Sequence, residues 1–457
     1  MVFNSVAFFI FLPIFFIIYF MLMKNLKLQN IFILISSFFF YAYWDVRFLF
    51  LLILTTVLDY FFALRIHSEQ NQQKRKMLLV TIICINLGFL FFFKYTNFFL
   101  NSFNDLFKAS GIPLQIHLLN IILPAGISFY TFHSLSYTID VYHRKVEPTR
   151  NYIAYASFVS FFPQLVAGPI SRARDMLPKL LTQRYVDKDR MIMGLSQIVV
   201  GFFKKVAIAD TLAVMVDFTY ANLYVVSPFQ ILFSLFLYSI QIYCDFSGYT
   251  DIALGLGKIF GIELKINFNR PYFAKNFSDF WERWHISLSS WLRDYLYIPM
   301  GGNRKGKFRM NQNLMVTMLL GGLWHGASYN FIIWGGLHGL FLILQRYIKI
   351  RVPNIVAILV TFTLTTLTWV FFRSPSLADS MYILKSIFHV HNFGVADTFL
   401  SVKALYLALV LLIFDLFFYR YFEKKGKYTT LLIDLILVLH VILFGTFTGG
   451  GFVYFQF

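Results

Sequence analysis

Long apolar runs follow one another along almost the whole 457-residue chain, and short polar or basic stretches separate them. A helix needs about 20 mainly apolar residues to cross the ~30 Å hydrocarbon core of a bilayer. One run, 152–170, contains Pro163, Gly168 and Pro169, so we interpret it as a re-entrant element. The pattern predicts an all-α polytopic membrane protein with about eleven transmembrane helices, in the runs 6–23, 30–43, 47–64, 78–93, 119–140, 191–217, 223–244, 313–345, 354–372, 402–419 and 429–447.

The polar stretches between these runs are too short to bury a core of their own, which predicts a single membrane domain over 1–457. The first run lacks a basic leader and a small-residue cleavage site, so we interpret it as a membrane helix rather than a cleaved signal. Only 245–312 interrupts the rhythm for long, with many charged, aromatic, Gly and Pro residues. Such backbone at membrane depth is tolerated where it lines a cavity. We therefore expect the catalytic core in 245–328.

The charge of the chain fits this picture. Hydrophobic residues make up 58% and charged residues 14%, outside ordinary globular usage, and the formal net charge is +18. Lys and Arg fall in short clusters between apolar runs, which is the positive-inside pattern and argues against nucleic-acid binding. Cys84 and Cys244 both lie in apolar runs and are interpreted as core residues without a disulfide framework. Alternating the spans predicts extracytoplasmic termini and cytoplasmic segments at 65–77, 142–150, 171–190 and 420–428.

Two histidines in aromatic surroundings, His285 and His325, are the main candidates for chemistry. An ionisable side chain within a membrane segment is costly, which makes it a functional-site hypothesis. Around His285, helical spacing predicts one amphipathic helix that lies in the interface or lines a cavity, capped by Ser278 or Asp279. Alternatively, His285 is a hydrogen-bonded histidine of an aromatic belt. The shared face of this helix would present Trp281, Trp284, His285, Leu288, Trp291 and Tyr295.

His325 lies in a glycine-rich apolar run, where glycines allow neighbouring helices or a substrate to approach closely. Burial is expected to keep its imidazole neutral, the form that a general base must have. His338, deeper in the same run, is the comparison, and no catalytic role is expected for it. No zinc site is predicted, because no HExxH or CxxC spacing accompanies these histidines. The carboxylates Asp245, Asp251 and Asp294 are expected to pair with a nearby Arg or Lys.

Several motifs together resemble those of the membrane-bound O-acyltransferases, and especially the branch that O-acetylates polysaccharides such as alginate and peptidoglycan. The resemblance covers essentially the whole chain. It rests on Leu123-Pro-Ala-Gly-Ile-Ser-Phe-Tyr130, Tyr137-Thr-Ile-Asp-Val-Tyr142, Phe161-Phe-Pro-Gln-Leu-Val-Ala-Gly-Pro-Ile170, Asp245-Phe-Ser-Gly-Tyr-Thr-Asp251, Asn267-Phe-Asn-Arg-Pro-Tyr272, the His285 segment and Trp324-His-Gly-Ala-Ser328.

The resemblance implies a bundle of about eleven transmembrane helices, with re-entrant and interfacial helices, around a central funnel. It implies that His325 is the catalytic residue and that His285 faces the same cavity. The implied donor is a cytoplasmic acyl thioester, acetyl-CoA, and no cofactor is permanently bound. His285 or nearby donors would position the ester or stabilise the oxyanion, and the basic edge at 304–307 could receive the phosphates of coenzyme A. The substrate-binding candidates are Asn267, Arg270, Trp284 and Trp324, although Asn267 and Arg270 could equally be structural.

The C-terminal segment 449–457 is the second candidate feature, because an aromatic tail follows three glycines. An exposed aromatic tail would favour aggregation in water, so the tail is expected to fold back onto the protein. In the family that the chain resembles, a similar tail carries a tyrosine proposed as a covalent acyl carrier, and the matching residue is Tyr454. The alternative is a simple aromatic anchor at the lipid headgroups.

Two functions remain open on these grounds. The favoured one is an acetyltransferase of the bacterial cytoplasmic membrane, surrounded by membrane lipids, that passes the group to an extracytoplasmic esterase-like (SGNH) partner for polysaccharide O-acetylation. The alternative is a transporter or flippase of an envelope precursor. The chain shows no obvious inverted repeat, and its ionisable motifs are concentrated in 245–328, which favours the enzyme. No motif selects the acceptor, and the compact length without added domains favours peptidoglycan or a general cell-envelope glycan.

Overall fold

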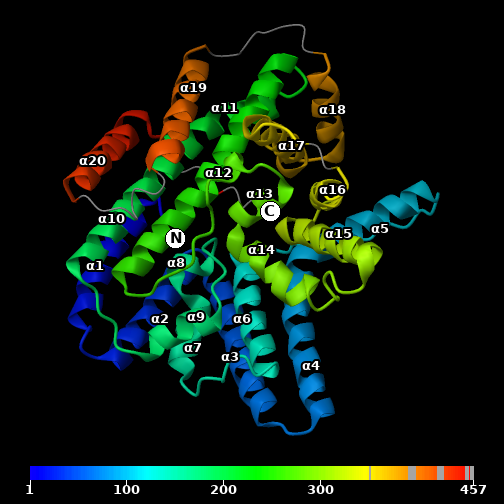
Figure 1. Cartoon of the computed structure of the whole chain (residues 1–457). Coiled ribbons are helices and arrows are strands. Elements are labelled where there is room, and N and C mark those ends of the chain that lie inside the picture. Colours follow the sequence, from blue (N-terminus) through cyan, green and yellow to red (C-terminus); the bar gives the residue numbers. More distant parts are fainter. Residues whose placement is uncertain (349–350, 390–397, 419–426, 448–451, 453–457) are drawn as a thin grey trace. The chain divides into compact units, whose positions relative to one another are not determined.

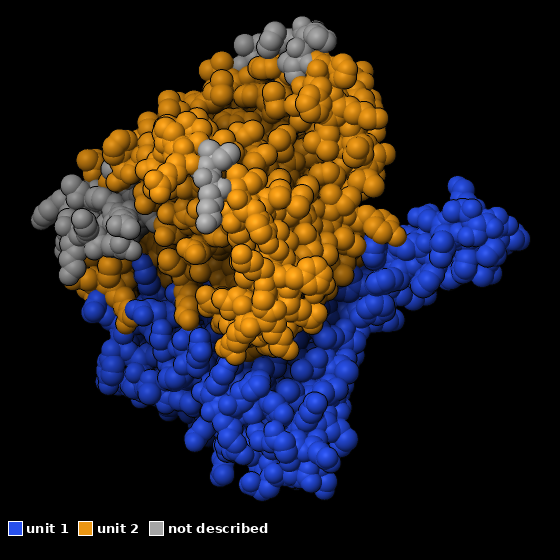
Figure 2. Space-filling view, turned by 45° about the vertical axis from the view of Figure 1, so that its right-hand side comes forward, with its two compact units in different colours: residues 1–187, 257–264 blue, residues 188–256, 265–457 orange. Residues whose placement is uncertain are grey.

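The computed structural model describes residues 1–348, 351–389, 398–418, 427–447 and Phe452. Every regular element in these residues is a helix, and none of them is a strand. The chain divides into two compact units, residues 1–187 with 257–264 and residues 188–256 with 265–457 (Figure 2). The single membrane domain expected from the sequence stays a prediction. Four described helices are long and apolar enough to cross a membrane, Val46–Ser68, Gln72–Ala109, Pro228–Ile259 and Asn354–Arg373.

In the first unit, polar side chains cap the starts of five helices. The side chains of Asn25 and Asn151 accept hydrogen bonds from the N–H groups of Leu28 and Ala154, which would otherwise have no partner in the helix. The helices of this unit are α1 (Val6–Met21), α2 (Leu26–Ala42), α3 (Val46–Ser68), α4 (Gln72–Leu90), the π-helix η1 (Phe91–Tyr95), α5 (Thr96–Ala109), α6 (Ile127–Tyr142), α7 (Tyr152–Ser160), α8 (Phe162–Leu165) and α9 (Ala173–Leu181).

The second unit contains all the candidate site residues that the structure describes. Figure 1 labels its α-helices, from α10 to α20. Its elements are α10 (Lys188–Phe202), the π-helix η2 (Phe203–Ala209), α11 (Asp210–Ala221), α12 (Pro228–Ile259), the 3-10 helix η3 (Pro271–Phe273), α13 (Phe277–Arg283), α14 (Ile286–Leu292), the π-helix η4 (Arg293–Tyr297), α15 (Gly306–His325), α16 (Tyr329–Leu344), α17 (Asn354–Arg373), α18 (Leu377–Ile387), α19 (Thr398–Ile413), the π-helix η5 (Phe414–Phe418) and α20 (Lys427–Phe444).

Several predicted boundaries were wrong. The run 119–140 becomes helical only at Ile127, because Gly126 before it has a left-handed backbone (φ 71°). The interruption expected from residue 245 onward begins later, since α12 continues without a break to Ile259. The apolar run 313–345 is two helices rather than one span, because the chain turns between α15 and α16. The run 152–170 is broken as expected, into α7 and α8.

The hairpin of α15 and α16 depends on close backbone contact. A Cβ at Gly322 would lie 2.2 Å from the carbonyl oxygen of Phe331, and a Cβ at Gly335 would lie 2.3 Å from that of Met318. No side chain fits at these separations, so glycine is required at both crossing points. This confirms that the glycines of this run allow neighbouring helices to approach closely, and it fixes the end of α15, where His325 lies.

Two of the segments predicted to be cytoplasmic lie together in the first unit. The buried guanidinium of Arg75 donates to the carbonyl oxygens of Ile66 (3.2 Å) and Tyr142 (2.7 Å), which joins 65–77 to the start of 142–150. Their shared side of the membrane is therefore supported, while the orientation stays a prediction.

We expect a single cysteine introduced by Lys74→Cys to be labelled by an impermeant maleimide in inside-out vesicles and not in intact cells. Lys74 is the suitable position because it is exposed, whereas Arg75 is buried and hydrogen-bonded. Cys84→Ser removes the exposed native thiol of the same helix. Labelling from outside intact cells would reverse the assigned orientation.

Candidate active site

The backbone around His285 turns sharply instead of continuing as a helix. Helix α13 ends at Arg283, Trp284 is extended (φ −101°, ψ 127°), and His285 has a left-handed backbone (φ 45°, ψ 51°) before α14 begins at Ile286. The single amphipathic helix predicted through this segment was therefore wrong. The predicted cap was also wrong, since the side chain of Asn276, not Ser278 or Asp279, accepts from the N–H of Asp279 at the start of α13.

Asn267 causes this turn. Its carbonyl oxygen accepts from Ile286 N (3.0 Å), and its side-chain Oδ1 accepts from both the backbone N–H (3.1 Å) and the hydroxyl (2.9 Å) of Ser287. These bonds satisfy the first N–H groups of α14, which a continuous helix would have bonded to its own preceding turn. Left-handed backbone costs energy in a residue with a Cβ, so His285 keeps it only because the surroundings enforce it. Asn267 thus acts as a positioning residue for His285.

His325 occupies the last position of α15, where a tight turn begins. The next residue, Gly326, is extended, and a Cβ there would lie 2.0 Å from Cε2 of Phe331. The side chain of Ser328 then caps α16 by accepting from Asn330 N (3.2 Å). The hairpin therefore holds His325 at the end of one helix with the Phe331 ring packed against the turn.

The structure brings the two predicted histidines together. Their ring centroids lie 6.3 Å apart, and the Trp324 ring lies 5.9 Å from His285 and 4.9 Å from His325. Aromatic rings cover the rest, with Phe246 4.7 Å from His285 and Trp334 5.1 Å from His325. His285 is 0% and His325 4% exposed. The result is an aromatic enclosure that buries two imidazoles side by side.

Burial controls the protonation of His285. This residue lies in the connection between two short helices, outside the four candidate spans, and desolvation lowers the pKa of its imidazole to about 3. A charged imidazolium is disfavoured where water cannot solvate it. His285 is therefore neutral at physiological pH, so one ring nitrogen carries a proton and the other can accept one.

His338 has different surroundings from this pair. Its Nε2 lies 3.1 Å from the hydroxyl of Thr368, and its ring packs between Phe280 (5.8 Å) and Trp334 (4.8 Å). Trp334 contacts both His325 and His338, so an indole ring lies beside each of them. His338 is therefore a buried histidine with a hydrogen bond to Thr368.

The other predicted substrate-binding residues have different surroundings. Trp324 touches both histidines and belongs to the enclosure. Trp284 is fully buried and packs on Phe268 (5.0 Å) and Trp369 (5.1 Å), which makes it a structural centre beside the site. The guanidinium of Arg270 lies over the Phe273 ring (6.0 Å).

All three carboxylates form the ion pairs that were predicted. Asp245 pairs with Lys205 (2.5 Å), Asp251 with Lys204 (2.8 Å) and Asp294 with Arg293 (2.9 Å). Sequence reasoning missed the two lysines, although two adjacent lysines inside the apolar run 191–217 were a usable signal. Cys244 is buried as expected, whereas the interpretation of Cys84 as a core residue was wrong, because its side chain lies on the exposed side of α4.

The aromatic tail reaches the same region. Tyr454 lies outside the described residues, but Phe452 is described and is only 3% exposed. Its ring lies 5.1 Å from Tyr249 and 5.9 Å from Phe246, the ring that also covers His285. The expected folding back of the tail is thus confirmed as far as Phe452.

Comparison with known proteins identifies the family to which this chain belongs. Residues 131–387 match the membrane-bound O-acyltransferase (MBOAT) family. The chain belongs to this family and is an O-acyltransferase, so the transporter alternative is set aside.

Individual relatives narrow the class. The chain is 40% identical to "Probable alginate O-acetylase AlgI" of Pseudomonas aeruginosa over 427 residues, which are 91% of this chain and 81% of that protein. It is 39% identical to "Peptidoglycan O-acetyltransferase" of Helicobacter pylori over 441 residues, covering 88% of this chain and 82% of that protein. A more distant relative is "Teichoic acid D-alanyltransferase" of Bacillus subtilis, 31% identical over 50% of this chain and 60% of the relative.

Proposed function

We propose that this protein takes an acetyl group from acetyl-CoA on the cytoplasmic side of a bacterial cytoplasmic membrane and passes it outward for O-acetylation of an envelope polysaccharide. The observation that carries the proposal is the enclosed pair of imidazole side chains, His285 and His325, with Phe452 of the C-terminal tail packed on the Phe246 ring beside it. The relatives are named for acetylation of alginate and of peptidoglycan, which suggests a polysaccharide acceptor.

The first chemical step would transfer the acetyl group to Tyr454. His325 accepts the phenolic proton, the phenolate oxygen attacks the thioester carbonyl, and a C–O bond forms as the C–S bond breaks. The imidazolium of His325 then returns the proton to the leaving thiolate, which gives free coenzyme A and a tyrosyl ester. His285, held by Asn267 and neutral, would donate its ring N–H toward the developing oxyanion. Trp324 would line the space that the thioester occupies.

In the second step a polysaccharide hydroxyl displaces the tyrosine, with an extracytoplasmic esterase-like (SGNH) partner as the catalyst. An aryl ester has a better leaving group than a sugar ester, because the phenol has a pKa near ~10, so this transfer is not uphill. The tail therefore serves as a carrier between a cytoplasmic donor and an external acceptor. This assignment requires extracytoplasmic termini.

A cluster of basic residues supports entry of the acyl donor from the cytoplasmic side. Arg304, Lys305 and Lys307 are exposed at the start of α15, the helix that ends at His325. A basic cluster of this kind attracts the phosphates of coenzyme A. It also fits the general cytoplasmic excess of Lys and Arg, so it supports the side of entry rather than a particular contact.

The proposal is tested with purified membranes sorted by orientation. We expect inside-out vesicles that contain the protein to release free coenzyme A from radiolabelled acetyl-CoA and to gain protein-bound label, while right-side-out vesicles do neither. Vesicles of the His325→Ala variant are the control for unrelated thioesterases. Equal consumption in both orientations, or consumption without any protein-bound label, would contradict the proposed donor side or the covalent carrier.

A further inference from the structure

The helical segment from Lys188 to Ala221 contains the π-helix η2, which changes the hydrogen bonding of the Val206 carbonyl. In an α-helix, the N–H of Asp210 would bond the carbonyl oxygen of Val206, but within η2 it bonds that of Lys205 instead. The carbonyl of Val206 is thereby released from this helical bond. It accepts a hydrogen bond from the backbone N–H of Thr446 (3.2 Å), two residues after the end of α20.

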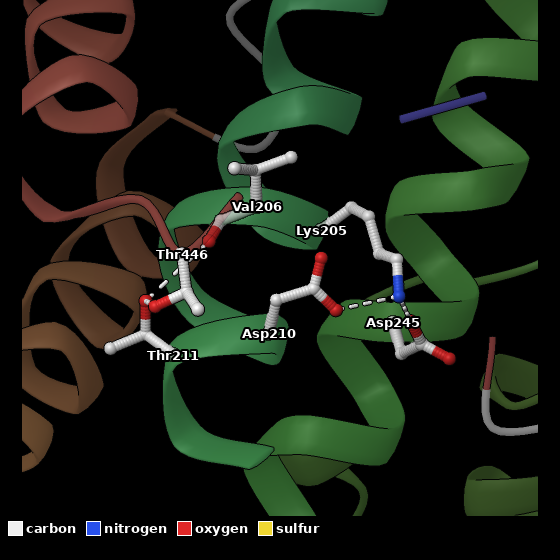
Figure 3. Close-up of polar contacts among 6 residues, drawn as sticks. All are labelled: Lys205, Val206, Asp210, Thr211, Asp245 and Thr446. Atoms are coloured by element: carbon white, nitrogen blue, oxygen red, sulfur yellow. Dashed lines mark hydrogen bonds and ion pairs between the residues drawn. The ribbon is translucent and has the colours of Figure 1, made fainter. Parts of the chain in front are cut away.

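The side chain of Thr446 is held on the same surface (Figure 3). The Thr211 hydroxyl donates its single proton to the carbonyl oxygen of Phe444 (2.9 Å). The Thr446 hydroxyl lies 3.0 Å from Thr211 Oγ1 and forms a hydrogen bond with it. Both the N–H and the O–H of Thr446 are therefore bonded to the η2–α11 segment, so the position and rotation of the chain are fixed at this residue.

Buried ion pairs make η2 a rigid base for this contact. Lys205 Nζ lies 2.7 Å from Asp210 Oδ1 and 2.5 Å from Asp245 Oδ1, and all three side chains are nearly buried. The pair with Asp245 ties η2 to α12 (Figure 3). Separating a buried ion pair leaves a buried charge without a partner, which strongly destabilises the fold. The connection between η2 and α12 therefore resists local rearrangement.

The same stretch of α12 carries the second contact of the tail. Asp245 is followed at once by Phe246, and Tyr249 lies one helical turn further on the same face. These two rings hold the buried ring of Phe452 at 5.9 and 5.1 Å. Phe246 also lies 4.7 Å from the His285 ring. One connected framework therefore runs from the Thr446 contact through Lys205 and α12 to the histidine enclosure.

We propose that η2 and the Phe246–Tyr249 face of α12 form a docking site that fixes the C-terminal tail at two points, Thr446 and Phe452, and so sets the register of Tyr454 relative to the histidine pair. The proposal rests on the tyrosyl relay of the proposed function.

Tyr454 lies two residues beyond Phe452, which is a reach of about 7 Å at ~3.3 Å per residue. Three glycines, Gly449 to Gly451, lie between the two anchors. Glycine has the largest conformational freedom of any residue. Anchors on both sides of the three glycines would therefore limit the positions that Tyr454 can reach. Thr446 and Phe452 are positioning residues on this account.

The test uses two separate readouts. Tail release is measured as the rate at which an impermeant maleimide labels a cysteine introduced by Phe455→Cys, in a Cys84→Ser, Cys244→Ala background. Acetyl transfer to the polysaccharide is measured in the same membranes without the added cysteine. Phe452→Ala removes the ring and Thr446→Val removes the hydroxyl with little change of shape. We expect each to raise labelling and to lower transfer, by about tenfold or more for Phe452→Ala and about 2- to 10-fold for Thr446→Val, the loss of one hydrogen bond.

The chain offers a matched control in the same segment. Phe447 lies one residue beyond Thr446 and is 69% exposed, so Phe447→Ala makes the same change of side chain without touching the docking site. It should alter neither readout. Unchanged labelling in both Phe452→Ala and Thr446→Val would overturn the docking site, and raised labelling with wild-type transfer would overturn its positioning role. Labelling does not depend on the relay, so failure of the relay itself appears separately, as full transfer in Tyr454→Phe.

Discussion

Replacement of His325 by alanine is expected to lower acetyl transfer by roughly 10²–10⁴-fold, the usual contribution of a general base. The reason is that the enclosure formed by His285, Trp324, Trp334 and His325 offers few groups able to take the phenolic proton. His325 lies at the end of α15 rather than in its middle, so its loss should remove little packing. The measurement is acetyl-CoA turnover per folded protein, with folding checked by thermal unfolding in detergent.

The matched control is His338→Gln. His338 is as deeply buried as His325 and lies on the adjacent helix α16, but its hydrogen bond goes to Thr368. Glutamine can keep a hydrogen bond to that hydroxyl, so we expect near wild-type turnover per folded molecule. His285→Ala should reduce turnover less than His325→Ala if its task is to orient the ester. Similar turnover in the His325 and His338 variants, at equal protein levels, would disprove the assignment of the base.

Tyr454→Phe is expected to abolish polysaccharide acetylation as completely as deletion of residues 452–457. The change removes only the phenolic oxygen and leaves the aromatic ring, so a tail that served merely as an anchor would tolerate it. Loss of the nucleophile prevents the covalent step altogether. The direct measurement is mass spectrometry of the C-terminal peptide after incubation with acetyl-CoA, where the wild-type peptide should gain one acetyl group.

Tyr224→Phe controls for the loss of a phenolic hydroxyl elsewhere in the same unit. The Tyr224 hydroxyl bonds Asp379 (2.6 Å) on the exposed side of the protein, and its removal should leave transfer unchanged. Full transfer in Tyr454→Phe combined with loss in the deletion variant would show that the tail acts by packing or partner docking. In that case the relay would be wrong while the docking of Phe452 would still hold.

The sequence by itself determined the class of fold and the chemical groups. Helical length and apolar content depend on local composition, so the runs alone predicted an all-α chain in which the long spans lie where the structure has α3, α12 and α17. Burying a carboxylate without a partner is so costly that pairing of Asp245 and Asp251 with an Arg or Lys was predictable without knowing which residues would be the partners. His285 and His325 were chosen as candidates from their surroundings in the sequence alone, and the structure places their rings 6.3 Å apart.

Only the tertiary structure decided how these groups are arranged. Helical spacing around His285 predicted a continuous helix. Instead, Ile286 and Ser287 donate hydrogen bonds to oxygens of Asn267, about 20 residues earlier, which replace the local ladder and hold His285 in a left-handed backbone. The π-turn that releases the Val206 carbonyl, and the distant Thr446 that bonds it, leave no periodic trace in the sequence. The physical reason is the same in both cases. Periodicity reports which face of a segment is apolar, whereas a bend in the backbone is stabilised by a partner from another part of the chain, and that partner is known only after the chain has folded.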